Sequence, residues 1–93
     1  HSSMDAAAAK NQVEAWQSEF AKQDSVAQIK VANADAAMAG STDPVKLQYL
    51  NEAHHNLDFA ESDESGGVHN HKYAMALLND AISKADIITG IQA

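Results

Sequence analysis

The residues best suited to chemistry in this chain are its histidines. Four of the five lie in the second half, as an adjacent pair, His54 and His55, and as an H-x-H pair, His69 and His71. A neutral imidazole can bind a metal ion through either ring nitrogen. A single zinc site would need these side chains to converge in a tetrahedral arrangement. His54 is expected about two to three helical turns from the segment that carries His69, so one metal ion held by all four is not expected.

The segment around His69 is arranged to present this side chain. Ser65, Gly66 and Gly67 stop one predicted helix and supply the positive φ values that a sharp reversal needs. Asn70 is a good N-cap, because its side-chain oxygen can accept a backbone N–H that the first helical turn leaves unpaired. An imidazole just before a helix lies near the positive end of the helix dipole, which favours the neutral form that binds metals. His69 is therefore the candidate metal ligand, and the alternative is an exposed turn residue.

The remaining histidines have plainer interpretations. His54 lies in the apolar stripe of its predicted helix, where a histidine is more often a core residue with one satisfied nitrogen than a ligand. It is kept as the second candidate cofactor-binding residue. His55 points away from that stripe, and both His55 and His71 are expected to be exposed. An H-x-H zinc pair is disfavoured, because this spacing off a regular strand gives no fixed convergence.

The same segment carries a resemblance to a known family. Gly66–Asn70, followed by Tyr73-Ala74 and Leu77-Leu78, resembles the S-G-V-H-N-P-x-Y-A-x-x-L-L segment near the C-terminal end of multihaem c-type cytochromes. The group includes ammonia-forming nitrite reductase, octahaem reductase and hydroxylamine oxidoreductase, and there the segment follows a helix resembling Asn51–Ser62. One departure is His71, which stands where the family usually has proline at the first helical position.

The resemblance implies a function and a location. Residues 1–93 would be a single helical domain excised from a longer periplasmic multihaem cytochrome that serves electron transfer or nitrogen-oxide reduction. His69 would be the distal ligand of a haem c held by the preceding domain of the same parent chain, and long helices would pack subunits together. Cysteine is absent, which excludes disulfides, thiolate metal sites and the C-x-x-C-H attachment of haem within this chain.

Composition narrows the function further. The net charge of -7 argues against nucleic acid or an anionic membrane as partner, since phosphate-binding surfaces need clustered Lys and Arg. No apolar run approaches the roughly 20 residues of a membrane span. No nucleophile–base–oxyanion arrangement or phosphate-binding glycine loop is found, so the isolated chain is not expected to be an enzyme. The acidic run at 58–64 is interpreted as a solvated helix end rather than a calcium or acid/base site.

Alanine-rich composition with a single proline predicts an all-α fold. Helices are expected over about 3–39, from Pro44 to about Ser62, and over 71–89, in an up-down-up antiparallel three-helix bundle. Their buried faces are expected to carry Leu47, Leu50, His54 and Leu57 on the second helix. The residues expected on the buried face of the third helix are Ala74, Leu77, Leu78, Ala81, Ile82, Ala85 and Ile88.

The first helix is expected to be unusually long. An apolar stripe recurs at three and four spacing through Val13, Trp16 and Phe20 and resumes at Ala27. A break at Asp24-Ser25 is the alternative, but no glycine or proline interrupts the pattern. Because such a helix outruns the other two, we expect homo-oligomers that form through its Val13, Trp16 and Phe20 face. The rival to the whole cytochrome interpretation is a haem-independent acidic helical interaction module.

Overall fold

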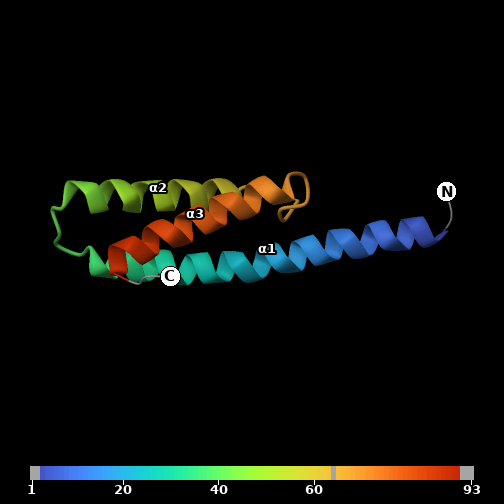
Figure 1. The fold of residues 1–93 in the computed structure, drawn as a ribbon, viewed down its shortest axis with the longest axis horizontal. Helices are drawn as coiled ribbons and strands as arrows, with labels where there is room; N and C mark the ends of the chain where they lie inside the picture. The colour runs from blue at the N-terminus through green and yellow to red at the C-terminus, as the bar shows by residue number, and fades with distance from the viewer. Residues whose placement is uncertain (1–2, 64, 91–93) are drawn as a thin grey trace.

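The computed structural model describes residues 3–63 and 65–90. They form three helices, α1 (Ser3–Ala37), α2 (Pro44–Glu61) and α3 (His71–Thr89). In Figure 1, α2 runs back along α1, and α3 returns in the direction of α1 and packs against both. The predicted all-α, up-down-up antiparallel bundle with one long N-terminal helix is therefore confirmed.

Helix α1 is continuous for 35 residues. Ser25, at the alternative break point, donates its hydroxyl to the Ala21 carbonyl at 3.1 Å, so its polar group is satisfied within the helix. The helix ends at Ala37, two residues earlier than expected. The chain then turns through Gly40, whose φ of 78° is the left-handed conformation that suits glycine. The prediction of an unbroken helix through Asp24-Ser25 is confirmed.

The N-terminal part of α1 extends beyond the other two helices. With 35 residues against 18 in α2 and 19 in α3, it passes the α2–α3 turn and gives the molecule extents of 59 × 21 × 16 Å (Figure 1). Residues 6–12 are all exposed, so this part of α1 is not covered by α2 or α3. The bundle proper starts near Trp16 and Phe20.

The core is formed by small and medium side chains that recur every three or four residues. It consists of Phe20, Ala27, Val31, Ala34 and Met38 from α1, Ala53, Leu57 and Ala60 from α2, and Ala74, Leu78, Ala81, Ala85 and Ile88 from α3. Alternating spacings of three and four average near 3.5 residues, the period of helices that pack at small crossing angles. The many alanines let the helix axes approach closely.

The buried face of α2 is rotated from the one expected. It carries Ala53, Leu57 and Ala60, whereas Leu47 is 38% exposed and His54 is at the boundary. The expectation failed because the stripe was drawn through the largest apolar side chains, while alanine takes the positions nearest the other helices. On α3 the expected face is confirmed.

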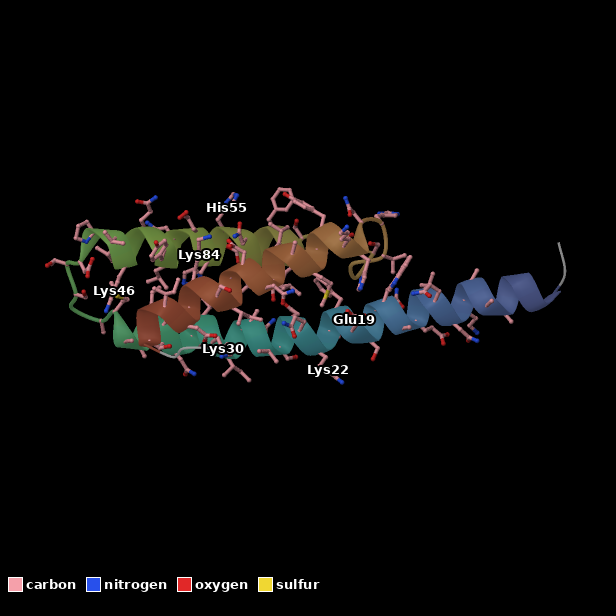
Figure 2. The ribbon with its side chains drawn as sticks, viewed as in Figure 1. Glu19, Lys22, Lys30, Lys46, His55 and Lys84 are labelled. Carbon is pink, nitrogen blue, oxygen red and sulfur yellow. The ribbon has the colours of Figure 1, made fainter. Side chains whose placement is uncertain are left out.

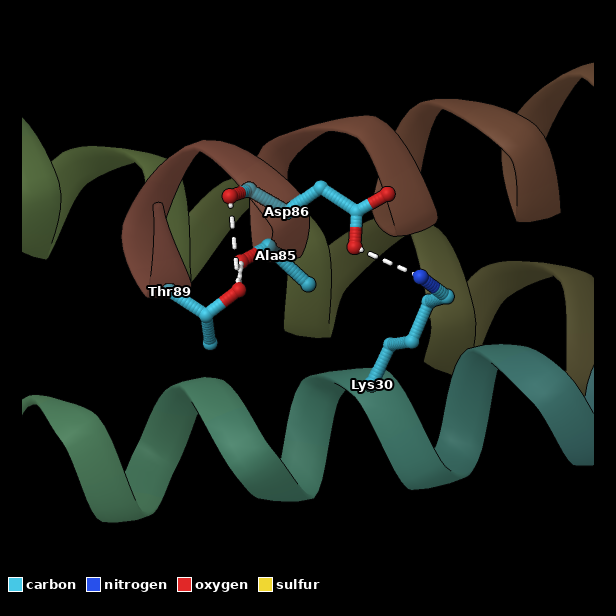
Figure 3. A network of polar contacts seen from close by, with 4 residues as sticks. All are labelled: Lys30, Ala85, Asp86 and Thr89. Atoms are coloured by element: carbon cyan, nitrogen blue, oxygen red, sulfur yellow. Dashed lines mark hydrogen bonds and ion pairs between the residues drawn. The ribbon is translucent and has the colours of Figure 1, made fainter. Parts of the chain in front are cut away.

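Specific polar contacts fix the helix ends and the register. Asp43 Oδ1 accepts the N–H groups of Val45 and Lys46 at 3.0 and 3.2 Å and so caps α2 ahead of Pro44. Lys30 Nζ of α1 donates to Asp86 Oδ1 of α3 at 2.7 Å, a contact drawn as a dashed line in Figure 3. Within the described residues, no helix is long and apolar enough to cross a membrane.

Candidate functional site

The α2–α3 turn is organised by the carboxylate of Asp63. Its Oδ1 accepts the backbone N–H of Ser65 at 2.9 Å and the Ser65 hydroxyl at 2.6 Å, and its Oδ2 accepts the Gly67 N–H at 3.2 Å. These hydrogen bonds, led by the one from the Ser65 hydroxyl, hold the pKa of Asp63 below its usual 3.8, because they favour the charged form. Asp63 is thus a structural anchor of the turn, a role that the interpretation of residues 58–64 as a solvated acidic helix end did not include.

The Ser65 hydroxyl links the Asp63 carboxylate to the backbone of His69. While its hydroxyl donates to Asp63, the same oxygen accepts the N–H groups of Val68 and His69, each at 3.0 Å. The backbone of His69 is therefore fixed relative to the end of α2 through a chain of hydrogen bonds. A sequence signal for this arrangement existed, since Asp and Ser side chains commonly bond backbone groups two to four residues on.

The turn is also fixed against α1. Gly66 and Gly67 have φ values of 64° and 85°, as the sequence predicts for this reversal. Gly67 is buried and lies against the Phe20 ring, close enough that a β-carbon there would be 2.8 Å from Phe20 Cδ2. Gln17 Nε2 donates to the Ser65 carbonyl at 3.4 Å. The position that presents His69 is thus set by α1 as well as by α2.

The His69 side chain is exposed, as predicted. In the described part of the chain, the hydrogen bond made by His69 comes from its backbone N–H, so its imidazole is available to a ligand. Asn70 caps α3 as expected, because its Oδ1 accepts the Tyr73 N–H at 3.2 Å. His69 therefore stands immediately before a capped helix.

An apolar pocket of about 270 Å³ lies beside His69, between the end of α2 and the start of α3. It is lined by Phe59, Ala60, Ser62, Asp63, His69, Asn70, Tyr73, Ala74 and Leu77. Phe59 and Tyr73 are 53% and 51% exposed and meet edge to face with ring centroids 6.2 Å apart. Aromatic walls with a single imidazole at the rim suit a flat, largely apolar ligand. Sequence reasoning missed this pocket, because Phe59 and Tyr73 come from different helices.

His71 was predicted to be exposed, but its side chain is largely covered. Its side chain is 15% exposed and stacks on Trp16, with ring centroids 5.3 Å apart and an angle of 14° between the planes. Its Nε2 lies 3.4 Å from Glu19 Oε2, and its Nδ1 is buried without a hydrogen-bond partner among the described residues. The N-terminal part of α1 extends past the turn and covers this face of α3. His71 thus fastens the first turn of α3 to α1.

His54 is not a core residue, contrary to the prediction. Its side chain is 44% exposed, and its Nε2 lies 2.7 Å from Asp35 Oδ1 on α1. It sits about two turns before the end of α2, away from the turn that carries His69. Among the described residues, no group of three or more His, Cys, Asp or Glu side chains is placed to hold a metal ion. The structure therefore does not bring His54 and His69 into one site.

His55 is exposed, as predicted, and projects from the outer side of α2 (Figure 2). It borders a second, open groove that also includes Asn56 and Lys84. These polar groups are already paired, since Lys84 Nζ and Asn56 Nδ2 each donate to Asp80 Oδ2 at 2.5 Å. The hydrogen bond to Asp80 is the main cause that raises the pKa of Lys84. Asn56 and Lys84 are therefore engaged in a structural polar network around Asp80.

The predicted association face of α1 is smaller than expected. Phe20 is 8% exposed beneath the turn and Trp16 is covered in part by His71, which leaves Val13 as a partly exposed member. Self-association through the long helix stays a prediction, with its apolar surface reduced to the extended N-terminal part.

Comparisons of the chain with protein-family models, with curated proteins and with solved structures found no match.

Proposed function

We propose that this chain is the C-terminal helical domain of a multihaem c-type cytochrome and that His69 is an axial ligand to one of its haems. The observation that carries the proposal is the exposed His69 imidazole on the rim of an apolar, aromatic-lined pocket. A mobile surface histidine would not need a backbone fixed by Ser65 and Asp63, whereas a ligand benefits from one.

The residues present fit a haem approaching from outside the chain. An imidazole nitrogen is a usual axial ligand of haem iron, and Phe59, Tyr73 and Leu77 offer apolar contact to the edge of a flat ring. A bound haem would supply one-electron redox chemistry. This chain would orient the ligand through its turn, exclude water at the pocket and hold the two parts of the parent protein together. Cysteine is absent, so covalent haem attachment belongs to the preceding domain.

The partner, location and assembly follow from the same proposal. The partner is the haem-bearing domain of the parent chain, and its compartment is the periplasm, where c-type haem is found in this family. The extended part of α1 provides the surface for contact with a second subunit. Electron transfer is the role of the domain, and reduction of nitrogen oxides belongs to the parent protein.

The test titrates this chain into a water-soluble haem c peptide that supplies one axial histidine and leaves the other axial position open. We expect binding to convert the haem to the low-spin, two-histidine form. The shift of the main haem absorption band monitors this conversion. His69→Ala should weaken binding by about tenfold or more, while His55→Ala, which removes another exposed histidine, should leave it unchanged. Equal binding by both variants would reduce His69 to an ordinary turn residue.

The second candidate is an acidic helical interaction module that uses no haem. The exposed side chains of Phe59 and Tyr73 favour it, because paired exposed aromatics often mark protein contacts. The natural reading frame ahead of His1 separates the two functions. C-x-x-C-H motifs there support the cytochrome proposal, and their absence throughout the frame supports the interaction module.

A further inference from the structure

Two carboxylates from different helices meet at the end of α2. Gln28 Nε2, on α1, donates to Asp24 Oδ2 at 3.1 Å and to Glu61 Oε2 at 2.5 Å. Asp24 Oδ1 is buried and has no hydrogen-bond partner among the described residues. A proton on one of the two carboxyl groups could provide the missing hydrogen bond. One amide thus holds together two acidic groups that would repel each other if both were ionised.

A proton shared by the two carboxyl groups would remove the repulsion between them. If Asp24 is protonated, its O–H can donate to Glu61, while the Gln28 amide still satisfies the remaining oxygens. Burial is the largest cause that raises the pKa of Asp24 to about 7, followed by the hydrogen bond to Glu61 and the negative charge of Glu61. Both the geometry and the direction of the pKa shift therefore favour a proton on this pair.

Among the described residues, no ion pair joins a cation to Asp24 or Glu61. From α2, the charged group that acts on Asp24 is Glu61. Next to Asp24 on α1, Gln23 contacts α3 through a neutral hydrogen bond, in which its Nε2 donates to Asn79 Oδ1 at 2.7 Å.

The charged contacts between α1 and α3 lie to either side of the pair, at Glu19 with His71 and at Lys30 with Asp86. The carboxylate of Asp63, in the turn after Glu61, is occupied by Ser65 and Gly67.

We propose that Asp24 and Glu61 form a proton-operated latch between α1 and the C-terminal end of α2. The latch is closed while the two carboxyl groups share a proton and loosens when both are ionised. Glu61 is the last residue of α2 and lies two residues before Asp63, which anchors the turn. Opening the latch therefore removes one of the contacts that hold the end of α2 to α1, while the contact of Gly67 with Phe20 still holds the turn. The latch does not depend on whether His69 binds haem.

The sign of the pH effect follows from the direction of the shift. Because the pKa of Asp24 is higher in the folded chain than the usual 3.8, its contribution to stability is fully present below about pH 3.8. That contribution is lost as the pH rises toward about 7. The latch thus releases near neutral pH, within the range where a small change in pH alters its population.

The test measures how far the end of α2 lies from α1 at pH 5 and pH 8. The chain has no cysteine, so Ser25→Cys with Ser62→Cys places two spin labels on exposed positions that flank the latch. We expect the distance distribution to be narrow at pH 5 and broader and longer at pH 8. Asp24→Asn keeps an amide that can donate to Glu61 and should stay narrow at both pH values. Asp58→Asn, an exposed carboxylate one turn earlier, should behave as the wild type.

Urea unfolding gives the thermodynamic side of the same test. The folding equilibrium constant of the wild type should fall by about tenfold from pH 5 to pH 8 relative to Asp24→Asn, after allowance for solvent screening of a partly exposed pair. Subtraction of the variant removes the pH dependence that the wild type and the variant share. A wild-type distance distribution that does not change with pH, or the same change in Asp24→Asn, would overturn the latch.

Discussion

Replacing Gly67 by alanine tests how the turn that presents His69 is fixed to α1. A β-carbon at Gly67 would lie 2.8 Å from Phe20 Cδ2 and 3.0 Å from Phe20 Cγ, closer than carbon atoms can approach. The backbone there has a φ of 85°, a conformation that costs an L-residue about 1–2 kcal/mol. Overpacking against a buried ring adds about 1–3 kcal/mol. Gly67→Ala should therefore lower the free energy of unfolding by about 2–5 kcal/mol.

A matched control separates the two costs. Gly40 has a similar φ of 78°, but a β-carbon there would meet nothing within 4 Å. Gly40→Ala should lose only the backbone part, about 1–2 kcal/mol. The difference between the two variants measures the contact with Phe20.

Urea unfolding followed by far-ultraviolet circular dichroism provides the assay, with equal slopes in both variants as the check on two-state behaviour. A Phe20→Ala background, which removes the ring, should bring the cost of Gly67→Ala close to that of Gly40→Ala. If Gly67→Ala costs no more than Gly40→Ala in the wild-type background, the turn does not rest on Phe20 and the reasoning about its position is wrong.

Three further outcomes are expected. Asp43→Ala removes the N-cap of α2 and should cost about 1 kcal/mol in urea unfolding, whereas Asp43→Asn should cost far less. His71→Ala uncovers Trp16 and should shift its fluorescence emission to longer wavelength, and no shift would contradict the stacking. Because the pKa of Asp63 is lowered, its stabilisation is present above about pH 3.8 and is lost as the pH falls further. The stability gap between wild type and Asp63→Ala should therefore be full at pH 6 and shrink in acid.

The helices could be predicted because their boundaries depend on local chemistry. Asp43-Pro44 begins α2, Asn70 begins α3, and Gly40 and Gly90 follow the ends of α1 and α3. Each of these residues acts through its own backbone or through N–H groups two or three positions away. Such signals do not require knowledge of the other helices. The exposure of His69 could be predicted for the same reason.

The errors concern residues whose surroundings come from another helix. His71 was expected in solvent but is covered by Trp16, which lies 55 residues earlier. His54 was expected in the core but lies at the boundary beside Asp35, because the packing of α1 on α2 places Ala53 and Leu57 innermost. The rotation of a helix about its own axis depends on its partners, and a stripe of large apolar residues does not determine it when alanine fills the closest contacts.

The roles of the carboxylates in residues 58–64 could also be predicted only in part from the sequence. The acidic run at 58–64 carries no single role, because Asp63 anchors the turn and Glu61 meets Asp24 across the helix interface. The role of Asp63 could have been read from the Asp-x-Ser-Gly-Gly order, which is typical of a side-chain-capped turn. The role of Glu61 could not, since its partner lies on α1, more than 30 residues away in the sequence.

The proposed axial ligation of haem by His69 is tested most directly in the multihaem cytochrome of which this chain is proposed to be a domain. His69→Ala should convert one haem from the low-spin to the high-spin state in electron paramagnetic resonance spectra, with a shift in the reduction potential of that haem. The thermal stability of the 93-residue chain itself should change by no more than about 0.5 kcal/mol, because the side chain is exposed. His54→Ala should leave every haem low-spin. If His69→Ala also leaves every haem low-spin, His69 is not a ligand.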